Sequence, residues 1–151
     1  MKKSIFTLLF VAIGGMTMFA AQPKIWLLGD GTMAGWGKAF AEQVGATVEV
    51  KNIAQEGLSM KVLDEMGGLD SLIVDKTKKD FLLVQLGQND LNETNLDTYS
   101  SLDDFTQKLV ALLHAAEKKK MMVILCTPLA HPYYKEGVLI DRLGGYAEAV
   151  R

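Results

Sequence analysis

Three short segments hold most of the residues whose types could do chemistry. They are Gly29–Gly37, Asn52–Ser59 and Gly87–Asp90, and each follows a short apolar run. A glycine such as Gly57 lets a backbone N–H approach a ligand closely, because no side chain stands in the way. An asparagine such as Asn89 adds a side-chain amide donor. These segments therefore predict a site that offers hydrogen-bond donors to a ligand.

Short apolar runs alternate with amphipathic stretches along the chain, which is typical of an α/β fold with a parallel sheet. We expect strands at Lys24–Leu28, Thr47–Asn52, Phe81–Leu86 and Met121–Thr127, and helices at Trp36–Gln43, Lys61–Glu65, Leu69–Lys76, Leu102–Lys118 and Leu143–Arg151. The last two strands are continuously apolar, so we expect both of their faces to be buried. The ligand crevice of such a sheet lies at the carboxyl ends of its strands, where the three polar segments are found.

The bulk composition limits the function further. A length of 151 residues suits one domain, and a net charge of -2 with a pI near 5.7 gives no electrostatic case for binding nucleic acid. The single cysteine, Cys126, excludes an internal disulfide and a cysteine-based metal site. We expect neither a metal nor a cofactor.

Residues 1–21 are predicted to be a cleaved signal peptide. Lys2 and Lys3 supply the positive start, the run from Ile5 to Ile13 is apolar, and Ala20 with Ala21 provides small residues before a cut. The alternative is a membrane anchor, but glycines interrupt the apolar stretch and no basic stop follows closely. We therefore expect a secreted or periplasmic protein that does not contact the membrane once the leader is removed.

The motifs in residues 24–151 resemble those of the SGNH (GDSL-type) hydrolases, and most closely the rhamnogalacturonan-acetylesterase-like branch. The first motif is Gly29-Asp30-Gly31-Thr32 with Gly35-Trp36-Gly37 behind it, and the second is Asn52-Ile53-Ala54-Gln55-Glu56-Gly57-Leu58-Ser59. The third is Gly87-Gln88-Asn89-Asp90, and the segment from Asp141 to Arg151 is similar to the stretch before the family's last motif.

The resemblance implies roles for three residues of a catalytic site. Gly31 stands at the position of the family's serine nucleophile, while Gly57 and Asn89 stand at the positions of oxyanion-hole donors. Fixed donors of this kind stabilise the tetrahedral oxyanion of ester hydrolysis. The resemblance also places Asp30, Thr32 and, in a different segment, His131 where they could contact a substrate. We expect the side chain of Asp30 to hydrogen-bond the backbone of its turn.

Two departures from the family pattern bear on activity. Gly31 has no atom that can attack a carbonyl, and the chain reaches Arg151 without the family's Asp-x-x-His motif, which supplies the base and its orienting acid. His131 does not match the family's catalytic histidine. We therefore expect residues 22–151 to form a C-terminally incomplete SGNH hydrolase-like domain whose catalysis is impaired.

Two simpler interpretations stay open. The spacing Gly29-x-Gly31-x-x-x-Gly35 after a strand could mark a dinucleotide-binding loop, although that fold wants an acidic residue where Asn52 stands. Gly57 and Asn89 could also be turn residues without a ligand.

The resemblance implies a flavodoxin-like three-layer α/β/α sandwich with parallel strands in the order 2-1-3-4, without the family's last strand. That arrangement predicts an exposed edge at the fourth strand, which could support self-association. The implied function is hydrolysis of acetyl esters on polysaccharide, in impaired form. The alternative is a non-catalytic protein that binds acylated glycans in the retained crevice.

Overall fold

The computed structural model describes residues 22–74, 79–129 and 133–151. The predicted signal peptide and His131 therefore lie outside the described residues. The predicted helix Leu69–Lys76 is too long, because the observed helix ends at Leu72 and the described residues 73 and 74 are not helical. No helix in the described ranges is long and apolar enough to cross a membrane.

A four-stranded parallel sheet forms the middle layer, with the strand order β2-β1-β3-β4. Its strands are β1 (Ile25–Gly29), β2 (Val50–Asn52), β3 (Phe81–Gln85) and β4 (Met122–Leu125). The predicted fold class and strand order are confirmed. The second strand is shorter than the prediction, which began at Thr47, because only its last three residues pair with β1.

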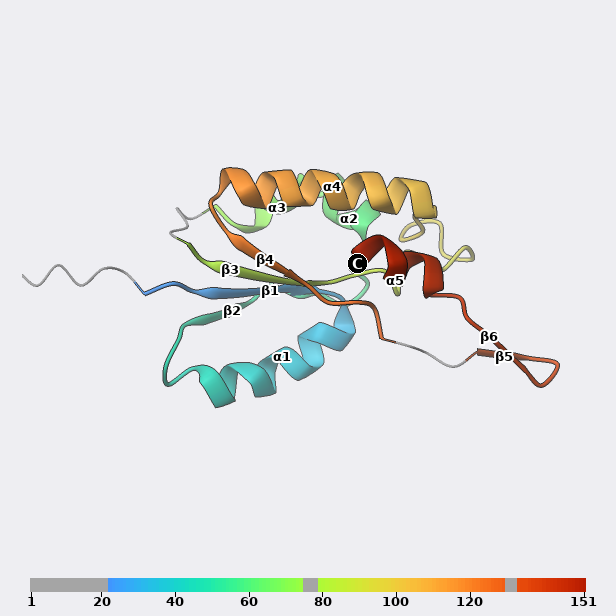
Figure 1. Cartoon of the computed structure of the whole chain (residues 1–151), viewed down its shortest axis with the longest axis horizontal. Coiled ribbons are helices and arrows are strands. Elements are labelled where there is room, and N and C mark those ends of the chain that lie inside the picture. The colour runs from blue at the N-terminus through green and yellow to red at the C-terminus, as the bar shows by residue number, and fades with distance from the viewer. Residues whose placement is uncertain (1–21, 75–78, 130–132) are drawn as a thin grey trace, which may run out of the picture.

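Helices cover the two faces of the sheet unequally (Figure 1). The helices are α1 (Gly31–Val44), α2 (Met60–Glu65), α3 (Gly68–Leu72), α4 (Leu102–Lys118) and α5 (Gly144–Val150). α1 lies alone on one face, and α2, α3 and α4 lie on the other, where α5 contacts α4. The main core fills the space between the sheet and this second group; its largest fully buried side chains include Phe105, Leu28, Leu58, Met60, Ile73, Leu82 and Leu86.

The long helix α4 begins and ends as the sequence predicts. The Ser101 hydroxyl accepts a hydrogen bond from the backbone N–H of Asp104 at 3.2 Å and caps the helix. Phe105, Leu109 and Leu112 form its buried face. The helical spacing of large apolar residues was therefore enough to predict this helix.

α1 begins five residues earlier than the predicted start at Trp36. Asp30 caps it by accepting a hydrogen bond from the backbone N–H of Thr32 at 2.8 Å, so the glycine-rich segment is helical rather than a loop. Gly37 lies where a Cβ would come within 2.9 Å of Leu27 and 2.8 Å of Asn52. The glycines that lower the helix propensity of this segment thus let α1 pack closely on the sheet.

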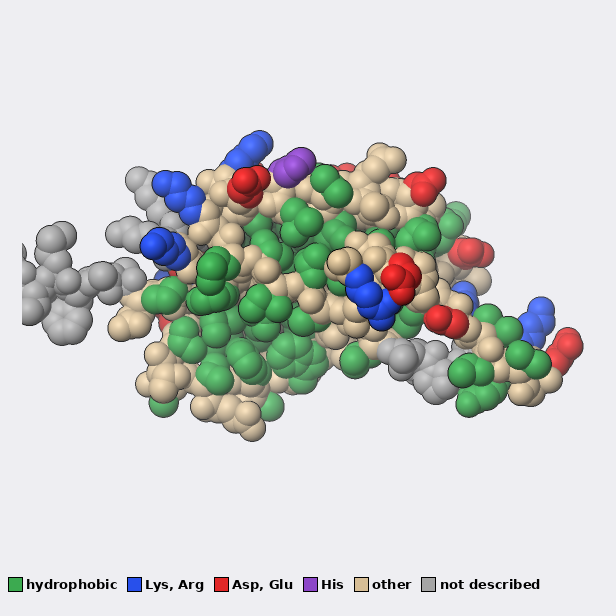
Figure 2. Space-filling view, viewed as in Figure 1, with side chains coloured by type: hydrophobic (Ala, Val, Ile, Leu, Met, Phe, Trp, Pro, Cys, Tyr) green, Lys and Arg blue, Asp and Glu red, His purple; other side chains and the backbone are tan. Residues whose placement is uncertain are grey.

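The prediction that β4 is buried on both faces is wrong. Met122 is 52% exposed and Ile124 is 46% exposed, because they face the side that α1 leaves uncovered. Figure 2 shows hydrophobic side chains gathered on this face of the molecule. β4 is also the edge of the sheet, as predicted.

A second, two-stranded sheet was not predicted. β5 (Tyr133–Lys135) and β6 (Val138–Ile140) form an antiparallel hairpin beyond the main sheet (Figure 1). Its two-residue turn has positive φ at both positions, 53° at Glu136 and 78° at Gly137. Such a turn suits a hairpin, but glutamate in its first position is a weak sequence signal.

Candidate functional site

The carboxyl ends of β1, β2 and β3 converge on one open crevice. Its lining consists of Asp30, Gly31, Thr32, Glu56, Gln88 and Asn89. Each of the three segments that the sequence singled out contributes at least one of these residues. The topology of the parallel sheet thus brings the polar segments together at the expected edge.

The first wall is the start of α1. Asp30 is 3% exposed, and its side chain caps the helix, as expected from the turn sequence. Gly31 is the first residue of α1, so its backbone N–H is one of the N-terminal donors that the helix itself leaves without a partner. Within the described part of the chain, no hydrogen bond engages that N–H.

The second wall is a tight turn over Gln55–Leu58. The backbone N–H of Leu58 donates to the carbonyl of Gln55 at 3.2 Å, and Gly57 has a φ of 75°. A positive φ at this turn position favours glycine, as in a type II turn. The N–H of Gln55 donates to the carbonyl of Gly29 at 3.0 Å, which holds the turn against the end of β1. The positive φ therefore explains why a glycine is found at position 57. Crowding does not explain it, because a Cβ there would meet no atom within 4 Å.

The third wall follows β3 and is held by side-chain amides. Asn89 Nδ2 donates to the carbonyl of Leu58 at 2.9 Å, which leaves its second N–H for another acceptor. Gln88 Oε1 accepts from the Thr32 hydroxyl at 3.0 Å, and Gln88 Nε2 donates to the carbonyl of Leu129 at 3.2 Å. Gln88 therefore links the start of α1 to the segment after β4.

The structure thus brings together most of the predicted site residues. Gly31, Asn89, Asp30 and Thr32 share the crevice, and Gly57 lies in the turn that forms its rim. His131 lies outside the described residues. The roles of Gly57 and Asn89 as oxyanion donors stay predictions.

Glu56 is the residue that sequence reasoning missed. A Cβ placed on Gly31 would lie 1.9 Å from Glu56 Oε2 and 2.6 Å from its Cδ. The carboxyl group of Glu56 therefore occupies the space in which a side chain at position 31 would begin. Its position in the second motif is visible in the sequence, but its direction depends on the turn and on the glycine opposite.

A buried polar cluster begins at Asp90, the residue that follows Asn89 of the crevice. The Asp90 side chain is fully buried and accepts from the backbone N–H of Met60 at 2.8 Å, and the Tyr146 hydroxyl donates to the carbonyl of Ser100 at 2.7 Å. Asp90 Oδ2 and Ser100 Oγ are both buried without a partner of ordinary hydrogen-bond geometry. Even so, the Ser100 hydroxyl lowers the pKa of Asp90.

Burial changes the pKa of Asp90 more than its polar neighbours do. It raises the pKa of Asp90 to about 6, and the backbone N–H of Met60 and the nearby hydroxyl of Ser100 only partly offset it. Burial also raises the pKa of Tyr146 to about 12, with smaller contributions from Tyr99, Asp90 and Glu93. The cluster joins α2, α4 and α5 behind the crevice and does not line it.

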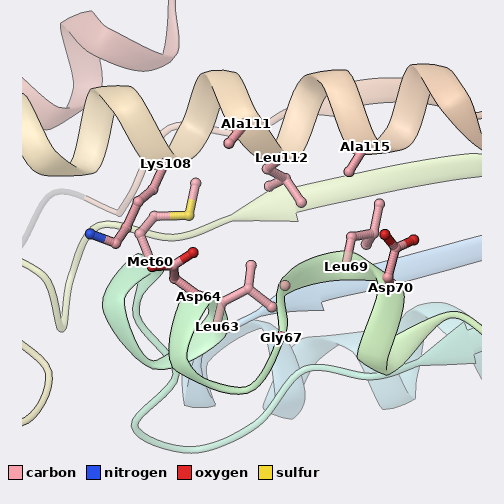
Figure 3. Close-up of a pocket in the computed structure, with 11 residues that line it drawn as sticks. Met60, Leu63, Asp64, Gly67, Leu69, Asp70, Lys108, Ala111, Leu112 and Ala115 are labelled. Atoms are coloured by element: carbon pink, nitrogen blue, oxygen red, sulfur yellow. The ribbon is translucent and has the colours of Figure 1, made fainter.

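A second cleft lies between α4 and the α2–α3 turn. Figure 3 shows Met60, Leu63, Leu69 and Leu112 lining it. Lys108 at its rim pairs with Asp104 on the same helix. No group of three or more histidine, cysteine or acidic side chains that could bind a metal is found in the described ranges. The cleft is a gap in helix packing, whereas the crevice at the strand ends collects polar groups from three segments.

Comparison with known structures defines the class of fold. The structure of an acetyl xylan esterase, AlAXEase, superposes with a TM-score of 0.68 at 19% identity, covering 84% of this chain and 70% of that one. A GDSL-like lipase (BT0569) from Bacteroides thetaiotaomicron gives a TM-score of 0.52 at 19% identity, covering 71% of this chain and 52% of that one. The fold is that of the GDSL/SGNH hydrolases.

Sequence comparison finds relatives that are rhamnogalacturonan acetylesterases. The chain is 30% identical over 139 residues to rhamnogalacturonan acetylesterase RhgT of Bacillus subtilis (strain 168), covering 85% of this chain and 59% of RhgT. It is 28% identical over 134 residues to "Probable rhamnogalacturonan acetylesterase YesY" of the same organism, covering 87% of this chain and 62% of YesY. No protein-family model matches. The chain is a homologue of rhamnogalacturonan acetylesterases and spans about three fifths of the length of these relatives.

Proposed function

We propose that this chain is an impaired acetylesterase: it recognises acetyl esters on polysaccharide through the crevice at the strand ends, but it does not hydrolyse them at the rate of a serine esterase. The observation that supports recognition is the placement of Gly31 and Asn89 in one crevice, with the Gly57 turn at its rim. The backbone N–H groups of Gly31 and Gly57 have no hydrogen-bond partner in the described ranges. Together with the second N–H of Asn89, they are donors suited to an acyl oxygen.

The missing step is nucleophilic attack. Serine esterases require a hydroxyl that a neighbouring base activates, and Gly31 provides none. Thr32 carries a hydroxyl beside this position, but that hydroxyl donates to Gln88. The donors could therefore hold an ester carbonyl, while no described hydroxyl is placed as the serine of a triad would be.

The second candidate is a binding protein that holds acylated glycans without cutting them. The position of Glu56 favours it, because the carboxyl group takes the space where the side chain of a nucleophile would begin. The two candidates differ in whether any ester turnover accompanies binding.

Two measurements test the proposal. Acetate release from acetylated polysaccharide and from nitrophenyl acetate should show no turnover at enzyme rates, which are about 1 per second or more. Calorimetric titration with acetylated oligosaccharides should show binding that Asn89→Ala weakens roughly 5- to 10-fold, as expected for about 1–1.4 kcal/mol from one hydrogen bond. Gln107→Ala removes an exposed amide on α4 and should leave binding unchanged.

The result decides between the candidates. Turnover at enzyme rates would contradict the loss of serine chemistry, and absence of glycan binding would contradict recognition. Binding without turnover would favour the binding protein, while slow release of acetate would favour an impaired hydrolase.

We also propose that the protein acts outside the cytoplasm, since polysaccharide substrates are found there and residues 1–21 have the pattern of a signal peptide. N-terminal sequencing of the protein recovered from periplasm or medium should find a start close to Gln22. Recovery from the cytoplasm with Met1 retained would contradict this proposal.

A further inference from the structure

The carboxyl group of Glu56 lies where a side chain at position 31 would begin. Its Oε2 and Oε1 atoms lie 1.9 and 3.0 Å from the position of a Cβ on Gly31. A Cβ and the backbone nitrogen of one residue are bonded to the same Cα, so the carboxyl group also lies beside the N–H of Gly31. A carboxyl group and a hydrogen-bond donor of the crevice are therefore neighbours.

Glu56 is also the group in the crevice that is free to take up a proton. Its carboxyl group is exposed and has no hydrogen-bond or ion-pair partner in the described ranges. The other acidic side chain in the described lining belongs to Asp30, which is 3% exposed and caps α1. The remaining lining side chains carry a hydroxyl or an amide, and neither takes up a proton near neutral pH.

Backbone contacts, rather than the side chain of Glu56, hold its turn in place. The N–H of Gln55 donates to the carbonyl of Gly29 at 3.0 Å, and the N–H of Leu58 donates to the carbonyl of Gln55 at 3.2 Å. A change of the Glu56 side chain should therefore leave the turn and the N–H of Gly57 where they are. The carboxyl group can be tested separately from the donors.

A carboxylate at this point could act on an ester in two ways. If it attacks the acetyl carbon itself, the intermediate breaks down back to the ester, because a carboxylate leaves more readily than a sugar alkoxide does. If it takes a proton from a water molecule, the water oxygen becomes the nucleophile and the carboxylate need not leave. The second route is the one that releases acetate.

We propose that Glu56 is a general base that activates a water molecule for attack on the acetyl carbonyl, which gives this chain a slow ester hydrolysis without a serine. This inference rests on the proposed function, because it assumes that the crevice holds an acetyl ester. It goes further by naming the nucleophile and the catalytic residue of the remaining activity.

The reaction has two proton transfers, both through Glu56. First, the water oxygen bonds to the acetyl carbon and one water proton passes to the carboxylate. The negative charge moves to the carbonyl oxygen, which accepts from the N–H groups of Gly31 and Gly57 and from the amide of Asn89. Then the bond between the acetyl carbon and the sugar oxygen breaks, and the sugar oxygen takes the proton from Glu56. The products are acetic acid and a free sugar hydroxyl. Because Glu56 is neutral while the oxyanion exists, it does not repel that charge.

The test measures acetate release and binding separately, with an acetylated rhamnogalacturonan oligosaccharide in a buffer free of small carboxylates. The wild-type chain should release acetate at less than about 1 per second. A general base contributes about 100-fold or more to a rate. Glu56→Gln keeps the size of the side chain, so it should lower the rate at saturating ligand by at least about 100-fold. The dissociation constant from calorimetric titration should stay close to the wild-type value.

Chemical rescue distinguishes a base from a structural residue. Glu56→Ala leaves space for a small carboxylate, so sodium formate should raise the rate of acetate release by Glu56→Ala. Formate should not raise the rate of Glu56→Gln, in which the amide fills that space.

Glu42→Gln is the matched control. Glu42 is an exposed glutamate near the other end of α1, roughly 16 Å along the helix from Gly31, so this variant has the same net charge as Glu56→Gln. It should keep the wild-type rate with and without formate.

The outcomes separate this role from the proposed function. Release by Glu56→Gln at the wild-type rate, or a rate of Glu56→Ala that formate does not raise, would overturn the role of Glu56 and leave an impaired acetylesterase standing. Binding by the wild type without any release would also overturn it and would favour the binding protein. If the wild type neither binds the oligosaccharide nor releases acetate, both proposals are wrong.

Discussion

Replacing Gly31 with alanine tests whether Glu56 fills the space beside it. The new Cβ would lie 1.9 Å from Glu56 Oε2, whereas ordinary contact begins at 3.4 Å, so the carboxyl group must move by about 1.5 Å. Moving it away from the helix terminus and into a less favoured rotamer costs about 1 kcal/mol. Alanine in place of a helical glycine stabilises by up to about 0.5–1 kcal/mol. The two effects nearly cancel, so Gly31→Ala alone should change the free energy of unfolding by less than about 1 kcal/mol.

A double-mutant cycle separates these effects. In a Glu56→Ala background the clash is absent, and Gly31→Ala should stabilise the protein, which gives a coupling of about 1 kcal/mol between the two positions. Urea unfolding curves provide the four free energies. Gly35→Ala is the control, because a Cβ at that position of α1 meets nothing within 4 Å and should stabilise equally in both backgrounds. If Gly31→Ala is additive with Glu56→Ala to within about 0.3 kcal/mol, the carboxyl group does not occupy this space.

Three further predictions concern the buried cluster and the sheet edge. Because the folded-state pKa of Asp90 is raised from 3.8 to about 6, the folded protein holds this proton more tightly, and the contribution of Asp90 to stability should fall as pH rises from about 4 to about 6. Asp90→Asn should flatten that dependence in urea unfolding, and an unchanged slope would contradict the raised pKa. Tyr146→Phe should lower the free energy of unfolding by about 1–3 kcal/mol, because it leaves the buried carbonyl of Ser100 without its donor; a change near zero would mean that water replaces the hydroxyl. Ile124→Lys should reduce any concentration-dependent association seen by sedimentation, because it places a charge on the apolar face of the edge strand β4; association that persists must use another surface.

The sequence alone determined the class of fold. Continuous apolar runs and the helical spacing of Phe105, Leu109 and Leu112 report burial directly, since burial of apolar surface drives folding. Parallel strand order then follows from crossover helices, and it predicts that polar segments meet at the carboxyl ends of the strands. The crevice could be predicted for that reason.

Tertiary structure decided the features that depend on distant neighbours. The start of α1 at Gly31 was missed because glycine lowers helix propensity, and only the cap at Asp30 with close packing on the sheet overcomes that cost. The exposed face of β4 was missed because an apolar run does not reveal which helices cover it.

The centre of the site also depends on residues that are distant along the chain. The absence of a side chain at Gly31 can be read from the sequence, and motif order predicts hydrogen-bond donors at Gly57 and Asn89. That Glu56 directs its carboxyl group into the resulting space cannot be read from the sequence. It depends on a turn held against β1 by a backbone hydrogen bond and on the position of the α1 terminus across the sheet edge, 25 residues away along the chain.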